Sequence, residues 1–281
     1  MERFLASLII IRPLNCLMAM AGVYLGAHLT WLSPVYYPVV VSMVAVFFIC
    51  ASGNIFNDLA DIDSDRINHP NRVLVKGRLS KQYVIRFGII LNLIGLILSA
   101  FVNLFVLGLA VVATVLLFWY NLGAKKIVLL GNLIIAVLAG LLFITGGMAV
   151  DWKLTLHLPG PLIGGVLAFF FHLVREIVKD CQDIEGDFQN YIKTLPQIIG
   201  LQRAVALVMA LFFVMVLFSY IPIIWGWYGF WFKIITVYIV DLPVLAFLIF
   251  LWGNPTPKML SYGSTLLKIG MLGGMVALFL T

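Results

Sequence analysis

The sequence predicts an all-α, polytopic membrane protein with about nine transmembrane helices. Hydrophobic residues make up 63% of the 281 residues and charged residues only 11%, which is far from the composition of a soluble domain. A helix needs roughly 20 apolar residues to cross the hydrocarbon core of a bilayer. Runs of that kind lie near residues 12–31, 36–57, 84–102, 104–122, 127–149, 160–179, 203–224, 229–252 and 262–280.

Several of these runs carry features beyond their apolar length. The first contains Arg12 and Asn15 and lacks a small-residue cleavage site, so we expect a retained helix rather than a signal peptide. The fifth and sixth include glycine-rich stretches (130–147 and 160–165), which let helix backbones approach closely. The eighth contains Asp241, an ionisable group that is costly inside a membrane. We expect it either to hydrogen-bond to a neighbouring helix or to serve chemistry in a cavity.

The distribution of positive charge predicts the orientation of the chain. With nine helices and an inner N-terminus, 16 of the 18 Lys and Arg residues lie in inner loops or at the adjoining helix ends, while Lys153 and Lys233 lie outside. The positive-inside rule then predicts a cytoplasmic N-terminus and an outer C-terminus in the cell (cytoplasmic) membrane. The chain has no soluble basic domain, so nucleic acid is not an expected partner. No linker divides the chain, and residues 1–281 are predicted to form a single membrane domain.

Two acidic clusters hold nine of the 12 Asp and Glu residues, within 58–65 and 176–187. Each cluster lies at the predicted inner end of a helix. The clusters are four helices apart, and this even separation gives both the same orientation, which fits a parallel internal repeat. The pattern D-x-x-D-x-x-x-D occurs in both clusters, which pairs Asp58 with Asp180, Asp61 with Asp183, and Asp65 with Asp187.

The spacing within each cluster predicts a site for divalent cations. Helix positions i, i+3 and i+7 share one face, so three carboxylates placed there would repel one another and raise each other's pKa. A hard cation removes that repulsion, and Mg²⁺ is typically held by one or two carboxylates together with waters and phosphate oxygens. Two sites of like design suggest two Mg²⁺ ions with a diphosphate between them. The alternative is a pair of solvated, acidic helix ends.

Basic and amide side chains near the clusters are suited to bind an anion. Arginine offers planar two-point contact to phosphate, and lysine offers a mobile point charge. The candidate substrate-binding residues chosen by position are Asn54, Asn57, Arg72 and Arg78 near the first cluster, and Arg175, Lys179 and Lys193 near the second.

At these motifs the chain resembles the UbiA-type intramembrane prenyltransferase superfamily. Its first motif, N-D-x-x-D-x-x-x-D, stands at 57–65 and its second at 180–187. Further similarities are R-P-L-N at 12–15, N-R and G-R within 71–78, Tyr120 with Lys125 before G-N at 131–132, and T-L-P at 194–196. The resemblance implies a ring of nine helices around a central cavity open to the membrane. It also implies substrate contacts at Asn15, Tyr120, Lys125 and Asn132.

The activity implied by the resemblance is transfer of a prenyl group from its diphosphate to a lipid-like acceptor among membrane lipids. Mg²⁺ would be held by the six aspartates on the cytoplasmic side. Either Glu176 or the released pyrophosphate would accept the proton of the acceptor. The residues expected to carry catalysis are Asp58, Asp61, Asp180 and Asp183.

The stretch V-R-E-I-V-K-D-C-Q-D-I-E-G-D at 174–187 is most similar to the ether-lipid branch of the superfamily. Members of that branch transfer a geranylgeranyl group to geranylgeranylglyceryl phosphate. The alternative is an aromatic acceptor, as in quinone, tocopherol or chlorophyll biosynthesis.

Two other classes of membrane protein are alternatives to a prenyltransferase. A cation or lipid transporter would place its sites near the bilayer midplane on broken helices. A phosphatidyl-alcohol transferase would carry an A-R pair at a spacing that this chain lacks.

Overall fold

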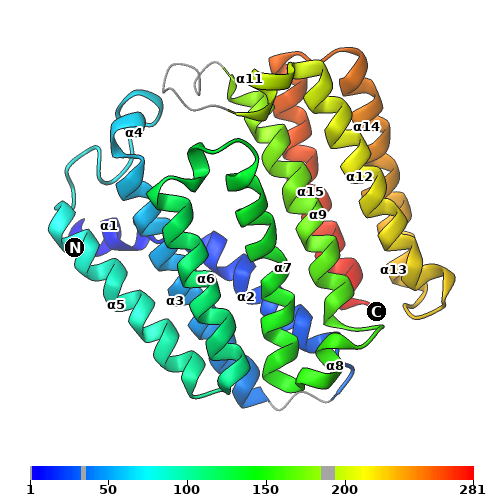
Figure 1. The fold of residues 1–281 in the computed structure, drawn as a ribbon, viewed down its shortest axis with the longest axis horizontal. Coiled ribbons are helices and arrows are strands. Elements are labelled where there is room, and N and C mark those ends of the chain that lie inside the picture. The colour runs from blue at the N-terminus through cyan, green and yellow to red at the C-terminus, as the bar shows by residue number, and fades with distance from the viewer. Residues whose placement is uncertain (1, 33–35, 185–193) are drawn as a thin grey trace. The chain divides into compact units, whose positions relative to one another are not determined.

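The computed structural model describes residues 2–32, 36–184 and 194–281, and every regular element within these ranges is a helix (Figure 1). The predicted all-α class is therefore confirmed. The elements are α1 (Glu2–Ile10), α2 (Pro13–His28), α3 (Tyr36–Ala60), α4 (Ile62–Asn68), α5 (Lys81–Ala100), α6 (Leu104–Leu122), η1 (Ala124–Lys126), α7 (Leu130–Val150), α8 (Trp152–Leu156), α9 (Pro161–Gln182), α11 (Leu195–Ile199), α12 (Leu201–Ile224), α13 (Phe230–Ile234), η2 (Ile235–Asp241), α14 (Leu242–Gly253) and α15 (Pro257–Phe279).

The described residues contain eight helical segments that are long and apolar enough to cross a membrane. The pair α1 and α2, which is bent by 45°, adds a ninth candidate span. Large apolar side chains such as Leu104, Leu122 and Trp225 are exposed on these helices, as expected where lipid takes the place of water. The chain is an integral membrane protein, and the spans agree with the predicted runs except at the first.

The first predicted run, 12–31, is broken and begins earlier than expected. Arg12 takes left-handed backbone angles (φ 52°, ψ 68°) between α1 and α2, because a residue before proline is disfavoured in the right-handed helical region. The break leaves the carbonyl of Ile11 outside the helical ladder. The side chains of Asn54 and Cys16 donate to this carbonyl at 2.9 and 3.2 Å, and they thereby satisfy a polar group that lipid could not.

The helices gather into two compact units. Unit 1 comprises Met1–Ala124 and Leu141–Thr155, and unit 2 comprises Lys125–Gly140 and Leu156–Thr281. Each unit carries one of the two acidic clusters, and the internal repeat stays a prediction. The assignment of the whole chain to a single domain stays a prediction.

In unit 1, α3 packs against α2, α5 and α6. The segment between α4 and α5 folds onto the end of this group, where Val73, Leu74 and Leu79 join Ile10 and Ile11 in one buried apolar cluster. This burial stabilises an otherwise irregular segment, and the same segment carries Arg72.

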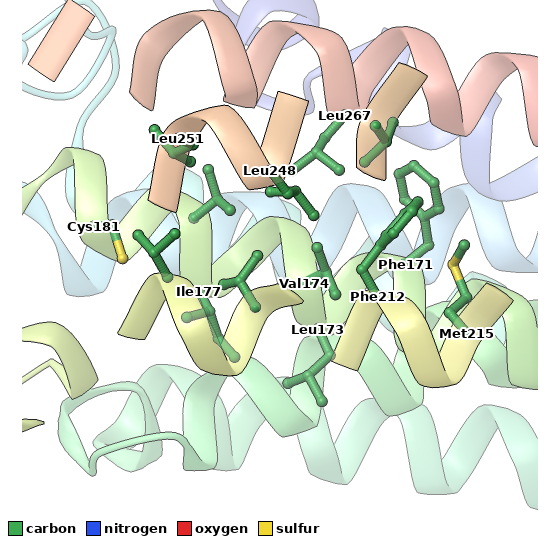
Figure 2. Packing of buried hydrophobic residues seen from close by; sticks show 14 of the residues in the cluster. Phe171, Leu173, Val174, Ile177, Cys181, Phe212, Met215, Leu248, Leu251 and Leu267 are labelled. Atoms are coloured by element: carbon green, nitrogen blue, oxygen red, sulfur yellow. The ribbon is translucent and has the colours of Figure 1, made fainter. Parts of the chain in front are cut away.

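In unit 2, α9 packs against α12 and α15 (Figure 1). Figure 2 shows Val174 and Ile177 of α9 among Phe212 of α12 and Leu248 of α14. Ser219 on α12 donates to Asp241 of the π-helical segment η2 at 2.9 Å. The hydrogen bond to a neighbouring helix that we considered for Asp241 is therefore present.

Two glycines in unit 1 let helix backbones approach within contact distance. A Cβ atom added at Gly26 of α2 would lie 2.0 Å from the carbonyl oxygen of Phe143 on α7, and one added at Gly146 would lie 1.8 Å from that of Val23. Real Cβ atoms do not come so close to another atom, so only glycine fits without separating the two helices.

We predict that Gly146→Ala destabilises the protein by about 1–3 kcal/mol, the usual range for overpacking a tight interface. The matched control is Gly108→Ala on α6, where an added Cβ meets no atom within 4 Å and the higher helix propensity of alanine favours folding. Unfolding in detergent mixtures measures both changes. Equal effects of the two substitutions would show that the α2–α7 contact does not require glycine.

Candidate functional site

The first acidic cluster lies where α3 passes into α4. Asp58 is in the last turn of α3, Asp61 occupies the junction and Asp65 lies in α4. The backbone N–H of Asp61 donates to the carbonyl of Asn57 at 3.0 Å, and that of Asp65 donates to the carbonyl of Asp61 at 2.8 Å. These i to i−4 bonds continue the helical spacing across the junction. The three aspartates therefore keep the predicted spacing, although α3 and α4 are separate helices.

Two arginines neutralise the buried carboxylates of this cluster. Asp58 and Asp65 are only 5% and 4% exposed. Nη1 of Arg72 lies 2.5 Å from Oδ2 of Asp65 and 3.3 Å from Oδ1 of Asp58, and Nη2 of Arg12 also pairs with Oδ1 of Asp58. Burial raises the pKa of the Asp65 carboxyl, and the Arg72 guanidinium opposes that rise. The ion pair with Arg72 thus favours the ionised form of Asp65, which burial alone would disfavour.

A cavity of about 440 Å³ opens beside these ion pairs. It combines a carboxylate, two guanidinium groups, an imidazole and an amide with an apolar wall, which suits a ligand that is anionic at one end. The lining residues are Ile9, Ile10, Arg12, Asp58, His69, Pro70, Asn71, Arg72 and Val73.

Arg12 and His69 are site residues that our sequence analysis missed. Arg12 was counted only as a topological charge, although it opens the R-P-L-N match. The proline after Arg12 was the available signal, because it predicts a chain break that can turn the preceding side chain away from the helix. His69 carried no comparable signal in the sequence.

The other predicted residues of unit 1 lie outside the cavity lining. Asn54 is half-buried and donates its amide to Ile11, so it supports the backbone beside Arg12. Asn15 and Arg78 are exposed, whereas Asn57 and Tyr120 are half-buried. Their assignment as substrate contacts stays a prediction.

The second acidic cluster lies at the end of α9 in unit 2. Asp180 accepts a hydrogen bond from Nδ2 of Asn132 at 2.8 Å, so two predicted residues that are 48 positions apart in sequence meet. Asp183 is the residue that follows α9, and its N–H donates to the carbonyl of Lys179 at 2.9 Å.

Arg175 and Glu176 form an ion pair nearly two turns before the end of α9, with Nη1 and Oε1 2.6 Å apart. Nε of Arg175 is buried and has no hydrogen-bond partner among the residues that the structure describes, which leaves one donor for a ligand. Lys179 is exposed and Lys125 is half-buried. The predicted Asp187 and Lys193 lie outside the described residues.

The residues of the first cluster fit Mg²⁺ through one or two carboxylates rather than three. Carboxylate oxygens are the ligands that this cation prefers, and it usually keeps waters and phosphate oxygens as its other ligands. Within the described ranges no group of three or more His, Cys, Asp or Glu side chains is close enough to hold a metal ion. Asp58 lines the cavity and pairs with both arginines through Oδ1, whereas Asp65 lies outside the lining and pairs with Arg72. The assignment of all six aspartates as ligands stays a prediction.

Comparison with known proteins places residues 15–263 within the UbiA prenyltransferase family. Among its relatives is the digeranylgeranylglyceryl phosphate synthase of Methanosphaera stadtmanae, which is 32% identical over 269 residues, 94% of each chain. The digeranylgeranylglyceryl phosphate synthase of Thermococcus kodakarensis is 36% identical over 222 residues, 78% of each chain.

Solved structures agree with these matches. One described as digeranylgeranylglyceryl phosphate synthase in membranes superposes with a TM-score of 0.83 at 31% identity and covers 99% of this chain and 98% of that one. A UbiA homolog from Archaeoglobus fulgidus bound to DMAPP and Mg²⁺ shares the fold, with a TM-score of 0.66 at 16% identity over 96% of this chain and 99% of that one.

We predict that Arg72→Met lowers the free energy of unfolding by about 3–5 kcal/mol, because it leaves a buried carboxylate without its cation. The matched control is Arg66→Met. The Arg66–Asp63 pair spans 3.4 Å with side chains 64% and 86% exposed, and pairs of that kind contribute about 0–1 kcal/mol. Adding Asp65→Asn to Arg72→Met should recover part of the loss. No recovery would show that Arg72 acts through packing and not through charge.

Proposed function

The chain belongs to the UbiA prenyltransferase family, and we propose that it transfers a geranylgeranyl group from geranylgeranyl diphosphate to geranylgeranylglyceryl phosphate. The observation that carries this proposal is the cavity in which Asp58 faces Arg12 and Arg72. A carboxylate beside two guanidinium groups suits a diphosphate accompanied by a divalent cation. The synthases named above, 32% and 36% identical over most of the chain, support the choice of donor and acceptor.

The two arginines of the cavity would bind the diphosphate. Each guanidinium has five N–H donors, and the pairs with Asp58 and Asp65 use only some of them. The remaining donors would contact phosphate oxygens, which stabilises the charge that accumulates as the allylic C–O bond breaks. Asn71 and His69 line the same cavity and would supply further polar contacts to the diphosphate.

Asp58 and Asp61 would hold one Mg²⁺, and Asp180 and Asp183 would hold another; when bound, these ions would supply positive charge for the leaving group. The use of Mg²⁺ and of a prenyl diphosphate is supported by the A. fulgidus homolog bound to DMAPP and Mg²⁺. We propose two ions, one for each cluster. Asn132 would orient the Asp180 carboxylate through its 2.8 Å hydrogen bond, as partners behind metal ligands generally do.

The residues before the second cluster would serve the acceptor. The spare Nε donor of Arg175 and the exposed ammonium of Lys179 suit the phosphate of geranylgeranylglyceryl phosphate. The acceptor hydroxyl oxygen would form the new C–O bond with the allylic carbon and lose its proton. Either Glu176 or the departing pyrophosphate would accept that proton. An aromatic acceptor would not need the second phosphate site.

We further propose that the protein lies in the cytoplasmic membrane with its N-terminus and both acidic clusters on the cytoplasmic side. The placement of 16 of 18 Lys and Arg residues supports this orientation through the positive-inside rule. Prenyl diphosphates are charged and water-soluble at one end, so a site at the inner helix ends can receive them without moving that charge across the bilayer.

We predict that Asp58→Ala, Asp61→Ala, Asp180→Ala and Asp183→Ala each lower turnover at least ~100-fold, the scale of losing one preorganised electrostatic group. Asp63→Ala is the control, because Asp63 lies within the first cluster but its side chain is 86% exposed and pairs with exposed Arg66. That variant should keep turnover within about threefold. Pyrophosphate release with saturating Mg²⁺ and geranylgeranyl diphosphate measures all five. Near-normal turnover in three of the four alanine variants would contradict the two-cation arrangement.

We predict a preference for geranylgeranylglyceryl phosphate over homogentisate or a hydroxybenzoate when equal concentrations compete for geranylgeranyl diphosphate. Mass spectrometry resolves the products. Lys179→Ala should weaken use of the phosphorylated acceptor about tenfold, by removing one charge-assisted contact worth about 1.5 kcal/mol, and should leave an unphosphorylated analogue unaffected. Predominant prenylation of the aromatic ring would overturn the ether-lipid acceptor while leaving prenyl transfer intact.

A further inference from the structure

Two cysteines of unit 1 lie on a pair of packed helices, next to the break in the first span. Cys16 lies on α2 and Cys50 lies on α3, and neither is in a disulfide. Nδ2 of Asn54 lies 3.8 Å from both sulfur atoms, so one amide nitrogen contacts both thiols. The Cys16 thiol donates its hydrogen to the carbonyl of Ile11.

Prenyl transfer as proposed above uses neither of these thiols, and neither lines the cavity beside Asp58. The contact with one shared amide brings the two sulfurs into the same neighbourhood. The Asn54 amide donates towards both of them. Soft thiolate ligands select soft ions, in contrast to the hard oxygen ligands of the acidic clusters.

We propose that Cys16 and Cys50 form a dithiol site that binds one soft, thiophilic metal or metalloid ion through both sulfurs. With the ion supplied as phenylarsine oxide, two S–H bonds break and two As–S bonds form. The arsenic oxygen leaves with the two protons as water, and no oxidant is required. Because both sulfurs lie within 3.8 Å of the same amide nitrogen, the second bond forms within the molecule at high effective concentration.

Binding of an ion at this site would change the hydrogen bonding of the backbone next to the cavity. Binding removes the Cys16 thiol proton, so the carbonyl of Ile11 loses one of its two side-chain donors. The next residue is Arg12, whose guanidinium pairs with Asp58. The dithiol site thus shares a backbone segment with the anion-binding residues although it lies outside their cavity.

The test is titration of the detergent-solubilised full chain with phenylarsine oxide, read by intact mass spectrometry. The folded wild-type protein should take up one equivalent with loss of one water. Cys181→Ser is the matched control, because Cys181 is also buried but lies alone in unit 2, and it should bind like the wild type. Cys16→Ser and Cys50→Ser should bind at least ~100-fold more weakly, since they lose the intramolecular second bond. The serine at position 16 keeps a donor for the Ile11 carbonyl.

A second measurement needs no variant. The wild-type protein is treated with phenylarsine oxide, then denatured and alkylated, and the modified peptides are identified by mass spectrometry. Cys16 and Cys50 should be protected together while Cys181 is fully alkylated. Alkylation of all three cysteines, uptake that survives loss of either Cys16 or Cys50, or uptake lost in Cys181→Ser would overturn the proposal. None of these outcomes depends on whether the protein transfers prenyl groups.

Discussion

The pairing of buried carboxylates with arginines from distant segments is the interaction on which the site depends. An isolated ionised carboxylate is costly in an apolar surrounding and tends to neutralise. Arg72 bridges Asp58 and Asp65, and Arg12 adds a second cation to Asp58. Without Arg72, burial would favour the neutral form of Asp65. The arginines therefore balance the buried negative charge, and their remaining N–H groups can serve as donors to an anion.

The irregular parts of the backbone position those two arginines beside the carboxylates. Pro13 breaks the first span, and the break turns Arg12 towards Asp58, while Asn54 satisfies the carbonyl that the break exposes. The segment after α4 has no helix of its own, but buried Val73 and Leu74 hold it beside α1 and so position Arg72. Apolar burial and one amide thus fix two charged side chains that helical geometry alone would not bring together.

Composition and spacing were enough to predict the spans and the acidic clusters, because apolar length and helical periodicity are local properties of the sequence. The contacts that complete the site were not predictable in the same way. Arg12 meets Asp58 across 46 residues, and Asn132 meets Asp180 across 48. Such pairings depend on how helices pack. The junction at Asp61 also escaped prediction, since no proline or glycine marks it in the sequence.

The close backbone contacts of Gly26 with Phe143 and of Gly146 with Val23 limit how this sequence can change in evolution. A methyl group at either position would strike a carbonyl oxygen of the other helix, and no side chain stands between them whose shrinkage could make room. A second substitution therefore cannot make room for a larger residue at either glycine. At most positions in a packed core, by contrast, a smaller neighbour can compensate for a larger side chain. Lineages descended from this chain must keep both glycines or move α2 away from α7, and α2 carries Cys16, whose thiol supports the Ile11 carbonyl beside Arg12.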